Sequence, residues 1–406
     1  MVMSDIRPVL SALLRNRTGA ILVSLQVAIA LAVLVNAIYI VKQRVDLIGR
    51  PTGMDVANVF TVISSGFTQD HDRLAAARND LAWLRSQPGV VAATRTNAIP
   101  LSGGGSSTGI RSEPDAPNDK TVAINYFEVD EGGLETFGVQ LVAGRNFRAE
   151  EIMPPDPNRS QAPPVAIITK SVARELFGTT DAVGKVAYDY MNRPTTIVGV
   201  IEHMHGSWVS WDRVDQVALL PMTPAFGGDN LYLVRAAPGA RDELMRKAEE
   251  YLATSDPTRM VRGVRALEYY RDRSYLSDRN MAIFLVSVTA LLAGVTALGI
   301  FALATFNVNV RTRQIGTRRA IGARRADIVR YFMVENWLVT TGGVLLGVAL
   351  AFGVGYWLST QYELPRLDLY YLLGGVLLLW ALGLAAAWQP SRRAARISPS
   401  VATRTV

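Results

Sequence analysis

Four long apolar runs divide the chain into membrane-type segments and one large polar region. The runs cover Thr18 to Val41, Met281 to Val310, Asn336 to Tyr362 and Leu369 to Gln389. A helix needs about 20 mostly apolar residues to cross the hydrocarbon core of a bilayer, so each run is long enough. The pattern therefore predicts four transmembrane helices. A cleaved signal peptide is the alternative for the first run, but its uncharged core is longer than the apolar region of such a signal, which favours a retained span.

Two strand-helix-strand units are predicted at the two ends of the polar region, which spans residues 42–280. The first unit lies at about 56–99 and the second at about 229–267. Their positions predict a split β-α-β subdomain assembled from both ends of the region. The expected elements are strand-like Val59–Ser64, helical Asp70–Ser86 and strand-like Val90–Thr96, and then Leu231–Ala236, Ala240–Ala253 and Met260–Ala266 in the same order.

The insert between these units, about 100–225, differs from them in composition. It is proline-rich from Pro154 to Pro164 and carries short apolar segments such as Val165–Thr169 and Thr195–Ile201, which predicts a second, β-rich subdomain. Residues 268–280 are polar and run without interruption into the second apolar run, so they are expected to extend that helix as a stalk. The predicted fold class is a membrane α-helical protein with four transmembrane helices and an α+β extracytoplasmic domain of two subdomains.

Charge is distributed unevenly along the 406 residues. Residues 42–280 carry 27 Lys and Arg against 30 Asp and Glu, so the rest of the chain holds an excess of ten positive charges. The net charge of +7 therefore does not indicate a nucleic-acid-binding surface, because the basic excess flanks the apolar runs. Cysteine is absent, which excludes a disulfide framework and thiolate chemistry.

The basic clusters predict the orientation in the membrane, since Lys and Arg accumulate on the cytoplasmic side of short loops. The clusters place the N-terminus (1–17), the segment 311–335 and the tail (390–406) in the cytoplasm, and residues 42–280 and the turn 363–368 outside. The arginines concerned are Arg7, Arg15 and Arg17; Arg311, Arg313, Arg318, Arg319, Arg324, Arg325 and Arg330; and Arg392, Arg393, Arg396 and Arg404.

No enzymatic motif is evident in the sequence. The segment nearest to a P-loop, GTTDAVGKV at Gly178–Val186, has one residue too many between its glycines and lacks the hydroxyl that would bind magnesium. His203 and His205 with Glu202 are ligand types for a metal, but a third strong ligand is missing. Neither a G-x-S-x-G elbow between a strand and a helix nor an H-E-x-x-H helix appears. We therefore expect no catalytic, metal or cofactor site in this chain.

Two features of the third apolar run point to helix packing. Gly343 and Gly347 have the spacing that lets membrane helices approach closely, and we predict a packing seam there. Glu335 stands at the edge of the same run, within about a turn of Arg330. Because a charge inside the bilayer is costly, a paired or snorkelling residue at the interface is favoured over an ion site.

The segment Arg311–Glu335, RTRQIGTRRAIGARRADIVRYFMVE, resembles the signature of the MacB/FtsX-like permeases of ABC transporters, a pattern similar to EIG-x-x-RA-x-GA-x-R followed by a helix with a glutamate. Gln314 stands where that family commonly has glutamate. LVAGRNF at Leu141–Phe147, VAIITKSVARELFG at Val165–Gly178, and VGK with IVGV at 183–185 and 197–200 resemble the MacB-type periplasmic core.

The resemblance implies a permease subunit in the bacterial inner membrane that binds no cofactor itself. ATP would be bound by a separate cytoplasmic ABC ATPase, two permease chains of the same or a similar kind would dimerise over two ATPases, and ATPase closure would move the periplasmic domains mechanically. Export is the expected process. A periplasmic adaptor, an outer-membrane channel and membrane lipids are further candidate partners, and nucleic acid is not. Lipoprotein extraction, activation of cell-wall hydrolases and an ATPase-independent ligand sensor are the alternatives.

The arginine-rich segment is the expected place of ATPase coupling. Ile315, Ala320, Ile321 and Ile328 would be apolar anchors inside a charged rim, and Gly316 and Gly322 would allow close approach or a bend. In the alternative interpretation, the arginines only fix the topology and bind anionic lipid. The candidate coupling residues are Arg311, Arg313, Gln314, Ile315, Gly316, Arg318, Arg319, Ala320, Ile321, Gly322, Ala323, Arg324, Arg325 and Glu335.

Overall fold

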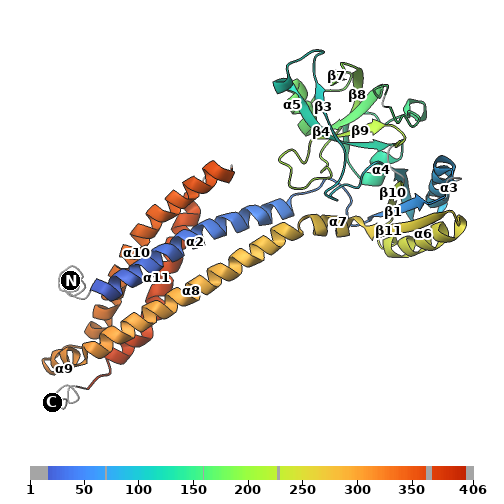
Figure 1. Cartoon of the computed structure of the whole chain (residues 1–406). Coiled ribbons are helices and arrows are strands. Elements are labelled where there is room, and N and C mark those ends of the chain that lie inside the picture. Colours follow the sequence, from blue (N-terminus) through green and yellow to red (C-terminus); the bar gives the residue numbers. More distant parts are fainter. Residues whose placement is uncertain (1–16, 69–70, 159, 226–228, 363–367, 399–406) are drawn as a thin grey trace. The chain divides into compact units, whose positions relative to one another are not determined.

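The chain folds into two compact units in a computed structural model that describes residues 17–68, 71–158, 160–225, 229–362 and 368–398 (Figure 1). One unit is formed by the two ends of the chain, up to Gly49 and from Ser277 onward, and the other by Arg50–Leu276. Arg7, Arg15 and Arg404, which entered the orientation argument, lie outside the described residues, as does most of the predicted turn at 363–368.

The first unit is helical, and four of the helices among its described residues are long and apolar enough to cross a membrane. They extend beyond the apolar runs of the sequence. The helix of the first run continues past Val41 to Gly49, and the helix of the third run begins at Arg325, well before Asn336. The helices are α2 (Arg17–Gly49), α8 (Leu276–Val310), α9 (Thr312–Ala320), α10 (Arg325–Tyr362) and α11 (Leu369–Ala394).

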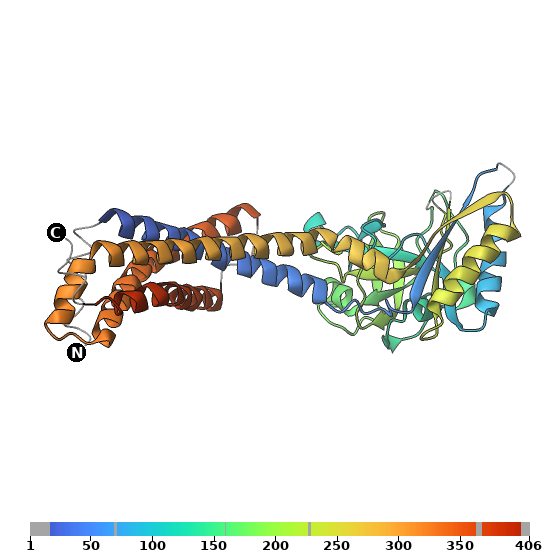
Figure 2. The ribbon, with the colours of Figure 1, turned by 90° about the horizontal axis from the view of Figure 1, so that it is seen from below.

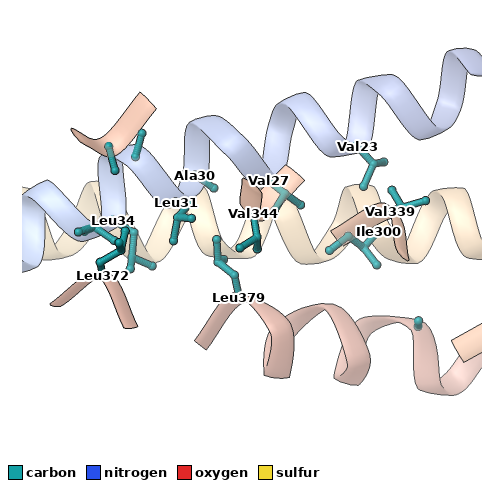
Figure 3. Packing of buried hydrophobic residues seen from close by; sticks show 14 residues of the cluster. Val23, Val27, Ala30, Leu31, Leu34, Ile300, Val339, Val344, Leu372 and Leu379 are labelled. Atoms are coloured by element: carbon teal, nitrogen blue, oxygen red, sulfur yellow. The ribbon is translucent and has the colours of Figure 1, made fainter. Parts of the chain in front are cut away.

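Helix α2 lies at the centre of the membrane unit. Val27, Leu31 and Val35 of this helix are fully buried, and they pack with Val344 of α10 and Leu379 of α11 among others (Figure 3). Helix α8, by contrast, leaves most of its apolar side chains exposed. The membrane unit therefore has a packed core around α2 and a large uncovered apolar surface on α8.

The second unit contains an antiparallel four-stranded sheet built from both ends of the domain, with strand order β11-β1-β10-β2. Helices α3 and α6 pack on one face of this sheet (Figure 2). Trp83 of α3 stacks on Tyr251 of α6 with ring centroids 3.9 Å apart. The two predicted strand-helix-strand units are thus confirmed. Their elements are β1 (Val59–Gly66), α3 (Arg73–Ser86) and β2 (Val90–Arg95), and β10 (Asp229–Ala236), α6 (Arg241–Ser255) and β11 (Arg259–Ala266).

A buried ion pair lies between this sheet and its helices. The carboxylate of Asp80 on α3 accepts hydrogen bonds from Nη1 of Arg259 at 2.5 Å and from the hydroxyl of Tyr232 at 2.6 Å. Burial raises the pKa of the Tyr232 hydroxyl, which keeps its proton in place for the carboxylate. Because the charges of Arg259 and Asp80 satisfy each other, helix α3 is held in one register on the sheet.

The insert forms a closed barrel of six strands, in the order β8-β6-β9-β4-β3-β7, which closes where β7 pairs with β8. A seventh strand, β5, pairs with the far end of β8. Side chains such as Ile124, Ile168 and Ile197 fill the interior, and the β-rich subdomain predicted from the short apolar segments is present. The strands are β3 (Ser107–Arg111), β4 (Val122–Val129), β5 (Leu141–Gly144), β6 (Val165–Thr169), β7 (Val186–Asp189), β8 (Pro194–Ile201) and β9 (Val217–Pro221), with α4 (Gly133–Phe137), α5 (Lys170–Phe177) and 3-10 turns at Asn118–Lys120 and Ala149–Glu151.

The expected stalk is not one unbroken helix. Helix α7 spans Leu267–Ser274, and Tyr275 leaves helical geometry with φ −89° and ψ 5° before α8 begins at Leu276. The side chain of Tyr275 is buried, with 2% of its surface exposed. Burial of this tyrosine in the domain competes with continuation of the helix, a tertiary effect that the polar sequence pattern of residues 268–280 does not reveal.

Candidate functional site

The arginine-rich segment folds as a short helix, α9, closed by a tight turn. Gly322 follows the helix with φ +102°, a conformation that side chains rarely adopt. The N–H of Gly322 donates to the carbonyl of Arg319, and the N–H of Ala323 donates to that of Arg318. These two bonds form a Schellman motif, which ends α9 and lets the chain turn into α10 within a few residues. Gly322 therefore provides the expected bend.

Helix α9 has one face packed into the membrane unit. Ile315 and Gly316 are buried, and Ile315 lies in a cluster with Val308 of α8, Phe332 of α10 and Ala394 of α11. Ile328 belongs to the same cluster, with 3% of its surface exposed. The interpretation of Ile315 and Ile328 as outward anchors for a partner is therefore corrected: in this structure they attach α9 to the three long helices around it.

The opposite face of α9 and the turn after it are exposed. Among the isoleucines predicted as anchors, Ile321 is the exposed one, with 81% of its surface accessible. It stands among basic side chains, since Arg313, Arg318 and Arg324 are also exposed. The remaining exposed members of the predicted set are Gln314, Ala320, Gly322 and Arg325, while Arg311, Arg319 and Ala323 are half-buried.

An ion pair joins the end of α8 to α10 beneath this surface. Nη1 of Arg311 lies 2.8 Å from Oε2 of Glu335, and Nδ2 of Asn307 donates to the other carboxylate oxygen at 3.3 Å. The side chain of Glu335 is 4% exposed and that of Arg311 15%. Proximity in sequence suggested Arg330 as the partner of Glu335; the partner is instead Arg311 on the other side of the α9 turn.

Two further arginines of the segment are held within the unit. The guanidinium of Arg318 lies over the ring of Tyr331, 4.9 Å from its centroid. Nη1 of Arg319 donates to the carbonyl of Ala395 at 2.8 Å, at the residue that caps α11. The segment is thus connected to α10 by Arg318 and to the end of α11 by Arg319, which makes α9 part of a rigid unit rather than a loose loop.

The two glycines of the predicted seam face α2. A methyl group added at Gly343 would lie 2.6 Å from the carbonyl oxygen of Ser24, and one at Gly347 would lie 2.9 Å from Cβ of Leu31. The hydroxyl of Ser24 donates to the carbonyl of Val339 at 3.0 Å across the same contact. Glycine thus permits the close approach of α10 to α2.

Metal ligands are not gathered in the described residues, where no group of three or more His, Asp and Glu side chains is close enough to hold an ion. Nε2 of His203 lies 2.8 Å from the carbonyl oxygen of Pro51, and Glu202 is paired with Lys170. His205 is buried, and its burial together with the neighbouring His203 lowers the pKa of its imidazole to about 4. In this structure His203 thus contacts the backbone of Pro51, and His205 is buried in the domain.

Two protein families match this sequence over most of its length. The MacB-like periplasmic core domain family matches residues 20–251, and the FtsX-like permease C-terminal family matches residues 286–399. The first region includes α2 and most of the extracytoplasmic unit. The second contains α9, Glu335 and the glycine seam.

Curated relatives combine these regions in proteins of different lengths. The chain is 28% identical to the pyoverdine export ATP-binding/permease protein PvdT of Pseudomonas aeruginosa, over 59% of this chain and 37% of that protein. It is 26% identical to the macrolide export ATP-binding/permease protein MacB of Shigella boydii, over 96% of this chain and 58% of that protein. It is 25% identical to the uncharacterized ABC transporter permease YknZ of Bacillus subtilis, over 68% of each. The matched parts thus span about a third to two thirds of these relatives.

Proposed function

The chain belongs to the MacB/FtsX-like family of ABC transporter permeases, and we propose that it couples ATP hydrolysis on a separate cytoplasmic ATPase to movement of its periplasmic domain for export. In this proposal the chain binds no nucleotide itself. Its termini and α9 lie in the cytoplasm, consistent with the arginines around the apolar helices.

The exposed face of α9 carries this proposal. Ile321 is 81% exposed at the turn, and the neighbouring Arg324 and Arg325 in the sequence are exposed as well. An apolar anchor inside a charged rim is the arrangement by which protein interfaces obtain both affinity and orientation. Arginines that only bound anionic lipid would not require an isoleucine at the tip of a turn that Gly322 fixes.

The contacts beneath α9 supply a route for mechanical coupling. Ile315 anchors α9 in the cluster shared by α8, α10 and α11, and the Arg311–Glu335 pair joins α8 to α10. Helix α8 has 35 residues, which corresponds to about 52 Å at 1.5 Å per residue and exceeds the roughly 30 Å of a bilayer core. If a partner displaces α9, helix α8 would therefore act as a rod and transmit the displacement along its length.

Export is the favoured process because PvdT and MacB are both named for export. A second permease chain, identical or similar, is the proposed occupant of part of the exposed apolar surface of α8, and membrane lipid covers the rest. An adaptor and an outer-membrane channel remain part of the proposal for the assembled exporter.

The proposal is tested by purifying the tagged full chain from its own cells and measuring how much ABC ATPase accompanies it. We expect Ile321→Asp to reduce the associated ATPase at least tenfold, since a desolvated carboxylate would replace the apolar anchor. Arg396→Ala, an exposed arginine of the basic tail, is the matched control and should leave association unchanged. Normal association of the Ile321→Asp variant would refute docking at α9.

A second measurement tests coupling itself. Export in intact cells should stop when the partner ATPase is made unable to hydrolyse ATP, with both proteins still assembled. Export that continues would contradict the proposed use of ATP, and a chain that purifies without any ATPase would favour the ATPase-independent sensor.

A further inference from the structure

A cavity of about 250 Å³ lies inside the extracytoplasmic unit, away from the coupling segment. Helix α3 and the end of β2 form one wall, and the segments that follow the 3-10 turn Ala149–Glu151 and strand β9 form the other. Most of its lining is apolar. The apolar residues that line it include Leu74, Ala77, Leu81, Ile152, Met222 and Pro224.

One buried cation lines this cavity. Arg95, the last residue of β2, has 5% of its surface exposed. Within the part of the chain that the structure describes, none of its three guanidinium nitrogens has a hydrogen-bond partner. An arginine presents five N–H donors, and buried charges are normally paired and hydrogen-bonded, so this guanidinium is arranged for a group that the protein does not supply.

The charged side chains near Arg95 do not pair with its guanidinium. The carboxylate of Asp130 also lines the cavity, but it pairs with Arg85 at 2.5 Å and accepts a hydrogen bond from Thr94 at 2.8 Å. Burial and the positive charge of Arg73 lower the pKa of Arg95, and the carboxylate of Glu128 offsets this only in part. The environment thus disfavours a bare cation and would favour an anion beside it.

The lining defines the charge and polarity of the missing group. Arg78 is solvent-exposed and the charge of Asp130 is neutralised by Arg85, which leaves the single buried positive charge of Arg95. A monoanion matches this balance, whereas a dianion such as a phosphate monoester would exceed it. A carboxylate can accept two parallel hydrogen bonds from one guanidinium, and the apolar wall requires an apolar body attached to it.

We propose that this cavity binds an amphipathic carboxylate, with its carboxylate paired to Arg95 and its apolar chain against α3. Leu74 is 38% exposed and lies at the rim, where such a chain would enter. The site is independent of ATPase docking, because it lies in the other structural unit.

The test uses the full chain in lipid nanodiscs and radiolabelled decanoate as the probe, with equilibrium dialysis as the readout. Empty nanodiscs measure partition into lipid, which is subtracted. We expect saturable binding to the wild type and at least a tenfold loss of affinity in Arg95→Met, which keeps an unbranched apolar stem and removes the guanidinium charge. Arg246→Met on the exposed face of α6 is the matched control and should bind decanoate as the wild type does.

Two further measurements distinguish the contribution of the Arg95 charge from that of the apolar cavity. Leu74→Trp, which fills the rim from its exposed side, should also weaken decanoate binding, and it keeps the test valid should Arg95→Met fail to fold. 1-Decanol, which lacks the charge, should bind wild type and Arg95→Met equally. Absence of saturable decanoate binding, unchanged binding in Arg95→Met, or tighter binding of decyl phosphate than of decanoate would each overturn the proposal.

Discussion

Nη1 of Arg311 lies 2.8 Å from Oε2 of Glu335, so a guanidinium just after α8 is paired with a carboxylate inside α10. The two residues stand on opposite sides of the α9 turn. Since Glu335 is almost completely buried, the pair fixes the distance between α8 and α10 at the base of the segment that we propose as the docking surface for an ATPase.

Replacing one partner of this pair should lower the stability of the membrane unit more than replacing both partners. We expect Glu335→Leu to destabilise the membrane unit by roughly 3–5 kcal/mol, because it leaves the Arg311 charge buried and unpaired. The double variant Arg311→Met, Glu335→Leu should recover much of the loss. Thermal unfolding in detergent, followed by tryptophan fluorescence, measures both.

Lys42→Ala is the control for this experiment, since the Lys42–Asp46 pair is more than half exposed and should contribute little. A double variant that is as unstable as Glu335→Leu alone would show that the pairing is not what stabilises this region.

The glycine seam should not tolerate a large side chain. Gly343→Leu would place atoms within 2.6 Å of the Ser24 backbone on α2, and such overpacking costs about 1–3 kcal/mol or separates the helices. We expect a lower thermal midpoint and a smaller yield in membranes. Gly353→Leu on the same helix is the matched control, because no atom lies within 4 Å of the added Cβ. Equal effects of the two variants would contradict a specific α2–α10 contact.

The turn after α9 should depend on glycine. Gly322→Ala forces a Cβ into φ +102°, which costs roughly 1–2 kcal/mol, and it should displace Ile321 from its exposed position. We expect ATPase association to fall several-fold while the chain still inserts. Gly294→Ala in α8, a helical glycine with open space around it, should leave association intact. Comparable co-purification of the ATPase by both variants would argue against a shaped turn.

The stability of the extracytoplasmic unit should fall in acid through His205. Its pKa is about 4 in the folded chain, against about 6.5 for an ordinary histidine, so between these values the unfolded chain binds a proton that the folded chain does not. The contribution of His205 to the free energy of unfolding is therefore fully present above pH 6.5. It decreases by about 3 kcal/mol as the pH approaches 4.

Thermal midpoints measured from pH 7 to pH 4 test this expectation. His205→Gln should flatten the profile relative to the wild type, while His203→Gln should reduce the slope less, because burial is the larger cause of the lowered His205 pKa. Identical profiles for the wild type and His205→Gln would show that burial of His205 does not contribute to acid sensitivity.

Much of the architecture follows from local patterns. The apolar runs predicted all four long helices found in the described residues. The strand-like segment at Val59 and the helical spacing of Leu74, Ala77 and Leu81 predicted the first strand-helix-strand unit. These signals are strong because a strand or helix that buries one face has its apolar residues spaced at the period of that element. The break at Tyr275 was not predicted, since a single buried tyrosine leaves no periodic signal.

The candidate site was predicted only in part. Glycine at position 322 indicated a bend, and the bend is present. The division of the isoleucines was not predictable: Ile315 and Ile328 are buried, while Ile321 is exposed, although all three stand in similar basic surroundings in the sequence. Which face of α9 turns inward depends on where α8, α10 and α11 leave room, and this is a property of their packing.

The sequence by itself determined the membrane character of the chain, the split domain with its β-rich insert, and the arginine-rich segment, because hydrophobic period and charge are local properties. Only the tertiary structure decided that Glu335 pairs with Arg311, that Gly343 lies against Ser24, and that Arg95 lines a cavity without a partner. Each of these facts joins residues from different elements, and their distances are set by how the helices and sheets pack.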